Sequence, residues 1–434
     1  MALRQTITIA TLLLLLTASI VPVVFVKGDD PLQGAWVDTI DGVLVMHLQG
    51  TPYNMGYQHG MLLGEKARQN LRAILAFSQK YGYTQEKLLA TWTAAKPYVP
   101  AEYIEEMQGL ADATNTTLDQ VGIAHIVPSF LHCSSFAAWG NATSDGRLIY
   151  ARSFDFPLYI QDPTSKTLLQ DNAVLIIREP SDGYASVDPS LAGMVGSDGG
   201  FNERGVAIDV LSCWSNDERH AGTPMMFRQR MILDHAANLT EALAILDANR
   251  TEGWNCIAAD TTQGIAVEQT ANHSYYGAWD DPIEATTPFW QIPSIVRRTN
   301  IFIDPQTAAT QRDLYNPRVL PILSFLLGKS KLGWNIVPAY LPWRHYLVLS
   351  HSLENTRGNL TLNTSMTLLR HVYDGTADPL FHLFVRLHLY CTLHQWVACP
   401  QTGEMLIAFA TGKHNAFTQP VHAFTLQELR DHQP

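Results

Sequence analysis

Three residues that can do chemistry together stand on either side of one turn of the chain. Cys133 lies near the start of an aromatic and apolar run, and Arg152 and Asp155 lie near the end of a second such run. The stretch 141–146 between the two runs is rich in turn-forming residues, so the pattern predicts a β-hairpin. Folding the chain back about the middle of this turn brings Cys133 beside Arg152–Asp155. We therefore expect a thiol, a guanidinium and a carboxylate to meet at one end of a hairpin.

The chemistry open to Cys133 depends on where it finds a base. His132 is its sequence neighbour and, in a strand, would point to the opposite face. A cysteine that becomes the first residue of a chain carries its own base, because its α-amino group has a pKa of about 8 beside a thiol of about 8.5. This requires a cut between His132 and Cys133, which the thiol can make by attacking the preceding carbonyl. An uncut thiol hydrolase with a Cys-His pair, using a distant histidine such as His59 or His125, stays open as an alternative.

The sequence around this hairpin resembles a known family. Cys133-Ser-Ser-Phe, a turn, and then Gly146-Arg-Leu-Ile-Tyr-Ala-Arg-Ser-Phe-Asp-Phe resemble the mature start of N-terminal-nucleophile hydrolases. The resemblance is to the penicillin acyltransferase-like branch, peptidase family C45. Choloylglycine (bile-salt and penicillin V) hydrolases, acid ceramidase and N-acylethanolamine acid amidase are more distant relatives. The turn is longer here than in most amidase relatives, which should lengthen the hairpin tip and leave its base in place.

Further short motifs follow in the order of that family. The run Gly50–Gly60 ends in Gly-Tyr-Gln-His-Gly, and Asn202-Glu-Arg-Gly resembles the family's Asn-Glu-x-Gly turn. Thr299-Asn300 resembles the segment that supplies an oxyanion-hole asparagine, and Arg318 stands where relatives often place another active-site arginine. The resemblance implies one set of site residues: Cys133, Arg152, Asp155, Asn202, Asn300 and Arg318.

Purely structural roles stay open for three of the residues in these motifs. His59 can be a buried hydrogen-bonded residue beside glycines that allow close helix packing. Asn202 suits a plain hairpin turn, where asparagine and glycine tolerate positive φ. Arg318 can be a solvated residue at the start of a helical stretch over 317–327.

The resemblance also implies a fold and a division of the chain. The fold class is α+β, a four-layer αββα sandwich of two mainly antiparallel sheets with helices outside. Residues 1–28 are a signal peptide or membrane anchor, 29–132 are the α-chain part of the hydrolase domain, and 133–434 are the β-chain part of the same domain. We expect the α and β fragments to stay associated after cleavage.

The implied reaction is hydrolysis or acyl transfer at a small-molecule carboxamide, through an acyl-thioester on Cys133. Asn300 and a backbone N–H hold the oxyanion, while Arg152 and Asp155 orient the amine and the thiol. The resemblance implies no cofactor and no metal. A non-catalytic exported binding protein on the same fold stays open as a further alternative.

The amino-acid composition limits the classes of partner that the protein is expected to bind. Lys plus Arg number 29 against 40 Asp plus Glu, for a formal charge of −11, and basic runs are absent from the sequence, so nucleic acid is not an expected partner. The five cysteines contain no CxxC pair, which excludes a zinc-ribbon reading. Aromatic residues such as Trp343 and Tyr346 could line an acyl pocket, although aromatics are more often core residues.

The N-terminal region predicts export. The uncharged, mostly apolar run Ile7–Val26 follows Arg4 and is long enough to span a bilayer. It is either a cleaved secretory signal or a retained anchor, with possible membrane association, and both readings place the body outside the cytoplasm. Asn-x-Ser/Thr sequons agree with export in a glycosylating host. They stand at Asn115, Asn141, Asn238, Asn249, Asn272, Asn359 and Asn363.

Overall fold

The computed structural model describes residues 30–126, 132–312, 336–377, 382–383 and 392–434. The described residues from 34 to 434 form one compact unit, which contains the segments on both sides of Cys133. The run Ile7–Val26, Arg318 and Cys391 lie outside the described residues. Within the described residues, no helix is both long and apolar enough to cross a membrane.

The larger of two sheets contains ten strands of the described chain. They are β1 (Trp36–Ile40), β2 (Val43–Gly50), β5 (Ala173–Pro180), β6 (Ser186–Leu191), β7 (Gly199–Asn202), β8 (Ala207–Asp209), β9 (Leu211–Ser212), β10 (Trp254–Ala259), β11 (Gly264–Gln269) and β12 (Ser274–Gly277). Their order is β1-β2-β5-β6-β7-β8-β10-β11-β12, and β9 pairs with β10. The β2–β5 ladder is parallel and the other pairings are antiparallel.

The smaller sheet carries the predicted hairpin. Its described strands are β3 (His132–Gly140), β4 (Gly146–Asp155), β13 (Ile295–Arg298), β14 (His394–Cys399), β15 (Glu404–Phe409) and β16 (His422–Thr425). They lie in the order β13-β3-β4-β14-β15-β16, all antiparallel. Cys133 pairs with Phe154, and a bulge near Gly140 takes up the irregular tip. The predicted meeting of Cys133 with the 152–155 segment is therefore confirmed.

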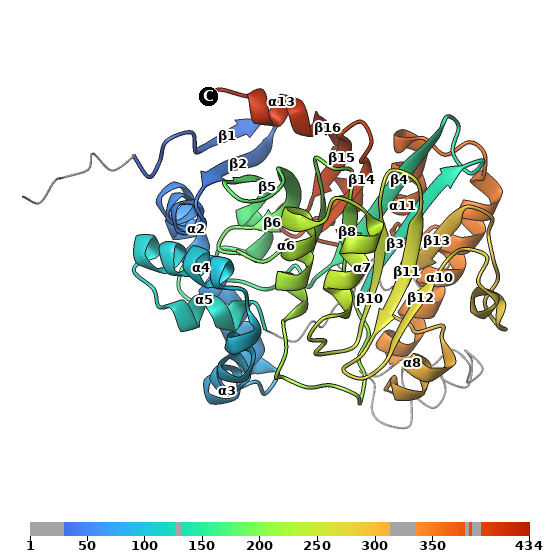
Figure 1. Cartoon of the computed structure of the whole chain (residues 1–434), viewed down its shortest axis with the longest axis horizontal. Helices are drawn as coiled ribbons and strands as arrows, with labels where there is room; N and C mark the ends of the chain where they lie inside the picture. The colour runs from blue at the N-terminus through green and yellow to red at the C-terminus, as the bar shows by residue number, and fades with distance from the viewer. Residues whose placement is uncertain (1–29, 127–131, 313–335, 378–381, 384–391) are drawn as a thin grey trace, which may run out of the picture. The chain divides into compact units, whose positions relative to one another are not determined.

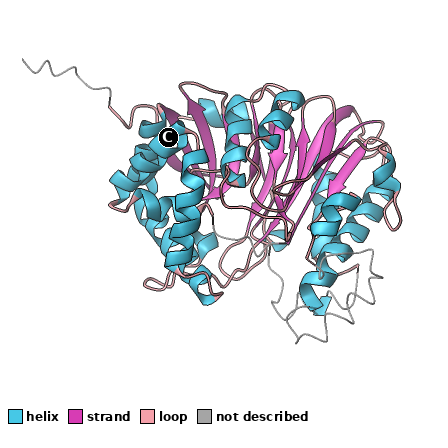
Figure 2. Cartoon of the chain, turned by 60° about the horizontal axis from the view of Figure 1, so that its bottom comes forward, coloured by secondary structure: helices cyan, strands magenta, loops and turns pink. Residues whose placement is uncertain are grey.

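Helices cover the outer faces of both sheets (Figures 1 and 2). They are α2 (Pro52–Lys80), α3 (Gln85–Ala95), α4 (Ala101–Thr114), α5 (Leu118–Ala124), α6 (Met225–His235), α7 (Leu239–Asp247), α8 (Pro305–Thr310), α10 (Ile336–Thr356), α11 (Leu362–Tyr373) and α13 (Leu426–Asp431). Short 3₁₀ turns lie at Lys96–Tyr98, Leu169–Asn172, Pro282–Ala285 and Ala416–Thr418.

The cores between these layers confirm the αββα arrangement. Leu175 and Ile257 of the larger sheet pack against Tyr150 and Trp396 of the smaller sheet in one buried cluster. Separate clusters place α2, α6 and α7 on the other face of the larger sheet, and α10 and α11 on the other face of the smaller one. Successive side chains of each strand point to opposite faces of the sheet, so each sheet contributes to an apolar core on both of its sides.

Small residues let α2 and α4 approach closely. A Cβ added at Gly56 would come within 1.8 Å of the Glu106 carbonyl oxygen, and one at Gly109 within 2.2 Å of the Tyr53 carbonyl oxygen. Thr51 caps the start of α2 by accepting from the Asn54 N–H, and Pro52 follows it. The glycines in the first turns of α2 therefore serve helix packing, in agreement with the structural role that the sequence left open.

Segments on the two sides of Cys133 share one sheet. The parallel β2–β5 ladder runs from Val45↔Leu175 to Gly50↔Pro180, joining a strand before the cysteine to one after it. The α2 face also packs on strands from both segments. Any cut before Cys133 would leave these contacts in place.

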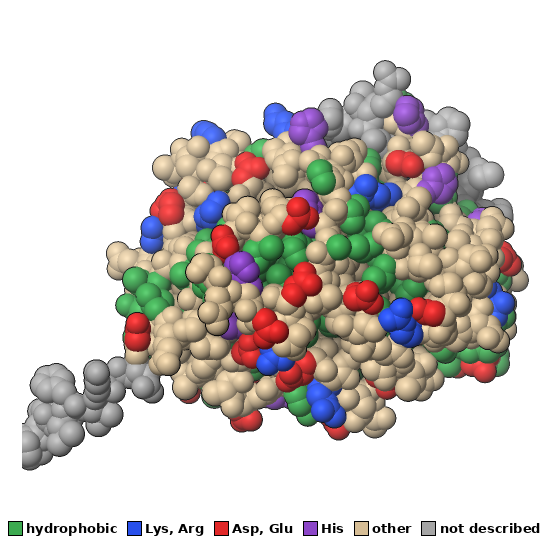
Figure 3. All heavy atoms as spheres, turned by 90° about the horizontal axis from the view of Figure 1, so that it is seen from above, with side chains coloured by type: hydrophobic (Ala, Val, Ile, Leu, Met, Phe, Trp, Pro, Cys, Tyr) green, Lys and Arg blue, Asp and Glu red, His purple; other side chains and the backbone are tan. Residues whose placement is uncertain are grey.

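Figure 3 gives a view of one face of the surface. Lys and Arg side chains are scattered there among Asp and Glu side chains. This distribution agrees with the acidic composition of the chain.

Candidate active site

Cys133 sits in the interior at the start of β3. Its side chain is buried, with the residue 1% exposed. Burial raises the pKa of the Cys133 thiol to about 12, although the Arg152 guanidinium charge opposes this rise and the Asp155 charge adds to it. The thiol is also within hydrogen-bonding reach of the Asp155 backbone N–H and the Arg152 guanidinium, both of which lower its pKa. In the uncut chain the thiol is thus protonated and held between a cation and a backbone donor.

Asn300 lies opposite Cys133. The β13–β3 register runs from Ile295↔Ala138 to Arg298↔Ser135, and continuing it by two residues brings Asn300 to Cys133. At this position the Asn300 side chain, and not a backbone carbonyl, accepts the hydrogen bond from the neighbouring strand. Asn300 Oδ1 accepts the Cys133 N–H at 2.6 Å, and Asn300 Nδ2 donates to the Ser212 carbonyl at 2.7 Å.

Two residues that the sequence did not single out hold Asn300 in place. Asn255 Nδ2 donates to the carbonyls of Thr299 and Ile301, both at 2.7 Å. Gln311 Nε2 donates to the Asn300 carbonyl at 3.1 Å. The backbone around Asn300 is therefore fixed on three sides, which fixes the direction of its side chain.

Arg152 joins the thiol to a second carboxylate, Asp198. The Arg152 side chain is fully buried, and its Nη1 lies 3.2 Å from Asp198 Oδ1. Nη1 also donates to the Asp198 carbonyl, and Nη2 donates to the Val210 carbonyl at 2.8 Å. Burial raises the pKa of Asp198 to about 6, against the opposing charge of Arg152. Asp198 stands in the predicted turn, but no pattern marked it as a site residue.

Asp155 is supported from within its own strand and from β14. Ser153 Oγ donates to Asp155 Oδ1 at 3.2 Å, and Gln395 Nε2 donates to Ser153 Oγ at 3.1 Å. On the neighbouring strand, the Tyr373 hydroxyl donates to Ser134 Oγ. The carboxylate is thus held by a buried polar chain that links β14 to β4.

The side chain of Asn202 forms its hydrogen bonds with backbone groups of its own turn and of the end of α6. Its Nδ2 donates to the carbonyls of Leu233 at 3.0 Å and Ala236 at 2.8 Å, at the end of α6. Its Oδ1 accepts the N–H groups of Arg204 and Val206, both at 3.0 Å. The structure brings Cys133, Arg152, Asp155 and Asn300 together, whereas the amide of Asn202 ties the β7–β8 turn to α6.

The histidines of the alternative Cys-His pair are bonded to backbone groups. His59 Nε2 accepts the Gly193 N–H at 2.8 Å, and His125 Nε2 accepts the Val195 N–H at 2.9 Å. His125 Nδ1 is bonded to the Val121 carbonyl at 2.9 Å. Burial lowers the pKa of His59 to about 3 and that of His125 to about 4. These contacts give both rings a structural role.

His394 is a further buried ring that sequence reasoning missed. It stacks on Phe154, the strand partner of Cys133, with 4.9 Å between ring centroids. Its Nε2 lies 4.0 Å from Asp198 Oδ1, and burial, followed by the charge of Arg152, lowers its pKa well below the usual range. Only the spatial adjacency of β4 and β14 brings it to the site.

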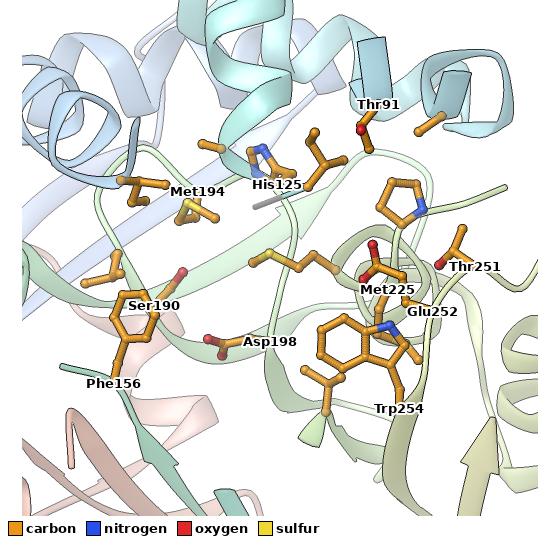
Figure 4. Close-up of a pocket in the computed structure, with 18 of the residues that line it drawn as sticks. Thr91, His125, Phe156, Ser190, Met194, Asp198, Met225, Thr251, Glu252 and Trp254 are labelled. Atoms are coloured by element: carbon orange, nitrogen blue, oxygen red, sulfur yellow. The ribbon is translucent and has the colours of Figure 1, made fainter. Parts of the chain in front are cut away.

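A cavity of about 110 Å³ opens beside this cluster (Figure 4). Arg152, Phe154 and Asp198 form part of its wall, and Phe154 is the strand partner of Cys133. Apolar side chains form much of the remainder: Ile74, Ile126, Leu191, Met194, Val210 and Met226. Such a cavity accommodates an apolar group adjoining the reacting bond.

The arrangement suits nucleophilic chemistry on a carbonyl. A thiol, a cation, a carboxylate and an amide side chain converge on one point beside an apolar cavity, which are the parts that acyl transfer requires. Among the described residues, no cluster of His, Cys, Asp and Glu could hold a metal ion. Arg318, the remaining member of the expected set, lies outside the described residues.

Comparison with known proteins supports this class. Residues 142–316 match the family model described as acyl-coenzyme A:6-aminopenicillanic acid acyl-transferase. This match confirms the resemblance to the penicillin acyltransferase-like family over that part of the chain.

Individual relatives are distant. The chain is 25% identical over 331 residues to an uncharacterized protein of Archaeoglobus fulgidus, covering 65% of this chain and 53% of that protein. It is 26% identical over 234 residues to protein dcd1B of Dictyostelium discoideum, covering 48% of this chain and 45% of that protein. The chain thus spans about half the length of these curated relatives. Among solved structures, penicillin V acylase from Agrobacterium tumefaciens is similar at a TM-score of 0.39 and 14% identity, over 68% of this chain and 87% of that one.

Proposed function

We propose that this protein is a self-cleaving cysteine amidohydrolase or acyltransferase whose nucleophile is Cys133. The observation that carries the proposal is the bond between the Cys133 N–H and Asn300 Oδ1, at 2.6 Å, with the thiol beside Arg152 and Asp155. After a cut before Cys133, that nitrogen becomes an α-amino group already held next to its own thiol. The amine then supplies the base that the bonded histidines do not.

Self-cleavage starts with an acyl shift. The thiol of Cys133 attacks the carbonyl carbon of His132, so a C–S bond forms, the peptide C–N bond breaks, and the thiol proton ends on the departing nitrogen. Water then hydrolyses the thioester, leaving a carboxylate on His132 and a free thiol and amine on Cys133. The β2–β5 ladder supports continued association of the two fragments.

Turnover repeats the same chemistry on a substrate. The thiol attacks a carboxamide carbonyl while the α-amino group takes its proton, and the leaving amine receives that proton as the C–N bond breaks. The second Nδ2 hydrogen of Asn300, beside the one bonded to Ser212, is directed to the developing oxyanion together with a backbone N–H. Arg152 and Asp155 orient the thiol and the amine. Water or an acceptor amine resolves the acyl-thioester, giving hydrolysis or acyl transfer on a small acyl-amide.

Intact mass and N-terminal sequencing of the purified protein test this proposal. We expect an α fragment ending at His132 and a β fragment from Cys133 to Pro434. Cys133→Ala should leave one uncut, inactive chain, whereas Cys133→Ser should cut slowly because a hydroxyl performs the acyl shift less readily. A β fragment that starts elsewhere, or full activity from an uncut chain, would refute the mechanism. An uncut wild-type chain that is inactive on amides would favour the binding-protein alternative.

We also propose an extracytoplasmic location. The sequon asparagines support it, because Asn238 is half-buried and the other six are exposed, so all can be reached by a glycosylating enzyme. The run Ile7–Val26 supplies the signal or anchor. A reporter fused after Pro434 that is active only in the cytoplasm would contradict this proposal.

A further inference from the structure

One wall of the cavity carries three polar side chains, those of Thr251, Glu252 and Trp254. Thr251 is 4% exposed and Trp254 is 9% exposed. Within the described part of the chain, Thr251 Oγ1 and Trp254 Nε1 have no hydrogen-bond partner. Glu252 stands between them in sequence, and all three residues line the cavity. Figure 4 shows them grouped on one side of the cavity, away from Asp198.

The carboxylate of Glu252 is not neutralised by a neighbour. Within the described residues, the ion pairs formed by Lys, Arg and His do not include Glu252. Glu218 and Arg312, whose charges act on it, pair with each other at 3.4 Å. Arg228, the other cation that acts on it, donates to the Leu246 carbonyl at 2.7 Å and to Gln269 Oε1 at 2.9 Å. Within the described residues, the wall therefore presents a carboxyl group that forms no ion pair, in a cavity whose lining also includes Arg152, Asp198 and Arg219.

We propose that Thr251, Glu252 and Trp254 form a subsite for a protonated amine, so that the substrate is an amide whose apolar body carries a cationic nitrogen. The subsite itself rests only on the geometry of this wall, while the word amide rests on the function proposed above for Cys133. A carboxylate beside an indole ring is a suitable receptor for an ammonium group, because the carboxylate accepts its hydrogen bonds and the ring face attracts its charge.

The environment of Glu252 supports this assignment. Burial, followed by the charge of Glu218, raises the pKa of Glu252 to about 7. A carboxyl group whose pKa is raised by desolvation gains most from a cationic partner, because the ion pair offsets the desolvation of its charged form. The apolar walls between this subsite and Arg152 then determine the length of the hydrocarbon that connects the amine to the scissile bond.

Calorimetric titration of the purified full-length protein with hexylamine and with 1-hexanol at pH 8 tests the subsite without requiring catalysis. At this pH the amine is protonated and Glu252 is ionised. We expect hexylamine to bind at least about tenfold more tightly than hexanol, the usual effect of a hydrogen bond to a charged group. Glu252→Gln should remove this preference and keep hexanol binding, which depends on the apolar walls. Glu218→Gln, which removes a nearby charge outside the cavity lining, should keep the preference.

Equal binding of the two probes to the wild-type protein, or an unchanged preference in Glu252→Gln, would overturn the proposal. Hydrolysis of the p-nitroanilides of 6-aminohexanoic and hexanoic acids tests the substrate class. A higher kcat/KM for the amino compound, lost in Glu252→Gln, supports it, and equal values contradict it. If neither anilide is cleaved while the amine preference persists and depends on Glu252, the catalytic proposal fails and the subsite stands.

Discussion

Asn300 Oδ1 accepts the backbone N–H of Cys133 at 2.6 Å, and this single contact joins the end of β13 to the start of β3. It is a side-chain bond at a position where the ladder would otherwise supply a backbone carbonyl. Because Asn255 and Gln311 fix the backbone of Asn300, the acceptor is held in place before any cut occurs. The contact therefore orients the nitrogen that the proposed mechanism uses as a base.

Replacing Asn300 should affect both cleavage and turnover. Asn300→Ala removes the acceptor for the Cys133 nitrogen and the amide donor for the oxyanion. We expect turnover per cut chain to fall by roughly 10²–10³, the usual loss for one oxyanion donor. Quantifying cut and uncut chains on a gel, beside kcat measured on the cut fraction, separates the two effects. Wild-type turnover in a cut and folded variant would assign the oxyanion contact to another group.

Asn202 offers a contrasting test. Asn202→Ala leaves the carbonyls of Leu233 and Ala236 and the turn N–H groups without their present partners. We expect the free energy of unfolding to fall by about 2–4 kcal/mol, because buried groups left unpaired are costly. The turnover of the folded fraction should stay near the wild-type value. Chemical denaturation beside kcat checks this, with the exposed Asn359→Ala as control. A loss of kcat without a loss of stability would return Asn202 to the catalytic set.

The hairpin and its register could be predicted from the sequence. The pairing of Cys133 with Phe154 follows from reflecting the chain about one turn, because a hairpin is a local structure. Other features also follow from local chemistry, since Asn238 caps α7 and a short turn after Asp260 joins β10 to β11. In contrast, β6 carries Pro189 in its middle, and a proline there removes the usual sign of a strand inside a sheet.

The remainder of the site depends on contacts between distant segments. His394 reaches the site because β14 lies beside β4, and Asp198 meets Arg152 because the larger sheet packs on the smaller one. Trp343 and Tyr346, for which a pocket-lining role was left open beside the commoner core role, pack with Phe289 in a separate buried cluster and are not among the cavity-lining residues. No periodicity or motif reports such adjacencies, so the cavity could not be derived from the sequence.

The buried state of His59 gives a pH-dependent prediction. Its pKa is lowered from about 6.5 to about 3, so the unfolded chain binds a proton that the folded chain excludes between these values. The stability contributed by the neutral ring is complete above pH 6.5 and is lost as the pH falls. His59→Gln keeps an acceptor for the Gly193 N–H and cannot be protonated. The stability advantage of wild type over this variant should therefore shrink by about 2 kcal/mol between pH 7 and pH 5.

Denaturant unfolding at the two pH values measures this difference, with the exposed His220→Gln as a control that should show no such change. Activity is a second readout of the same variant. Because His59 contacts a backbone N–H, the folded His59→Gln protein should cut itself and turn over substrate at pH 8. Loss of turnover in a folded variant, together with a wild-type chain that stays uncut, would favour the uncut Cys-His alternative.

The last prediction concerns the pair formed by Arg152 and Asp198. The carboxylate partly neutralises the guanidinium that lowers the pKa of the Cys133 thiol. Asp198→Asn keeps the backbone carbonyl contact and removes the negative charge, so the thiolate should be favoured relative to wild type. Because Asp198 in the wild type has a pKa of about 6, the asparagine imitates its protonated form. The kcat/KM profiles of the two proteins should therefore coincide below about pH 6 and separate above it. Above pH 6, the part of the variant's kcat/KM profile that reports ionisation of the Cys133 thiol should shift to lower pH by up to about one unit.

The exposed Asp182→Asn is the matched control and should follow the wild-type profile throughout. A ratio of variant to wild type that is constant with pH would show that Asp198 has no electrostatic influence on the nucleophile.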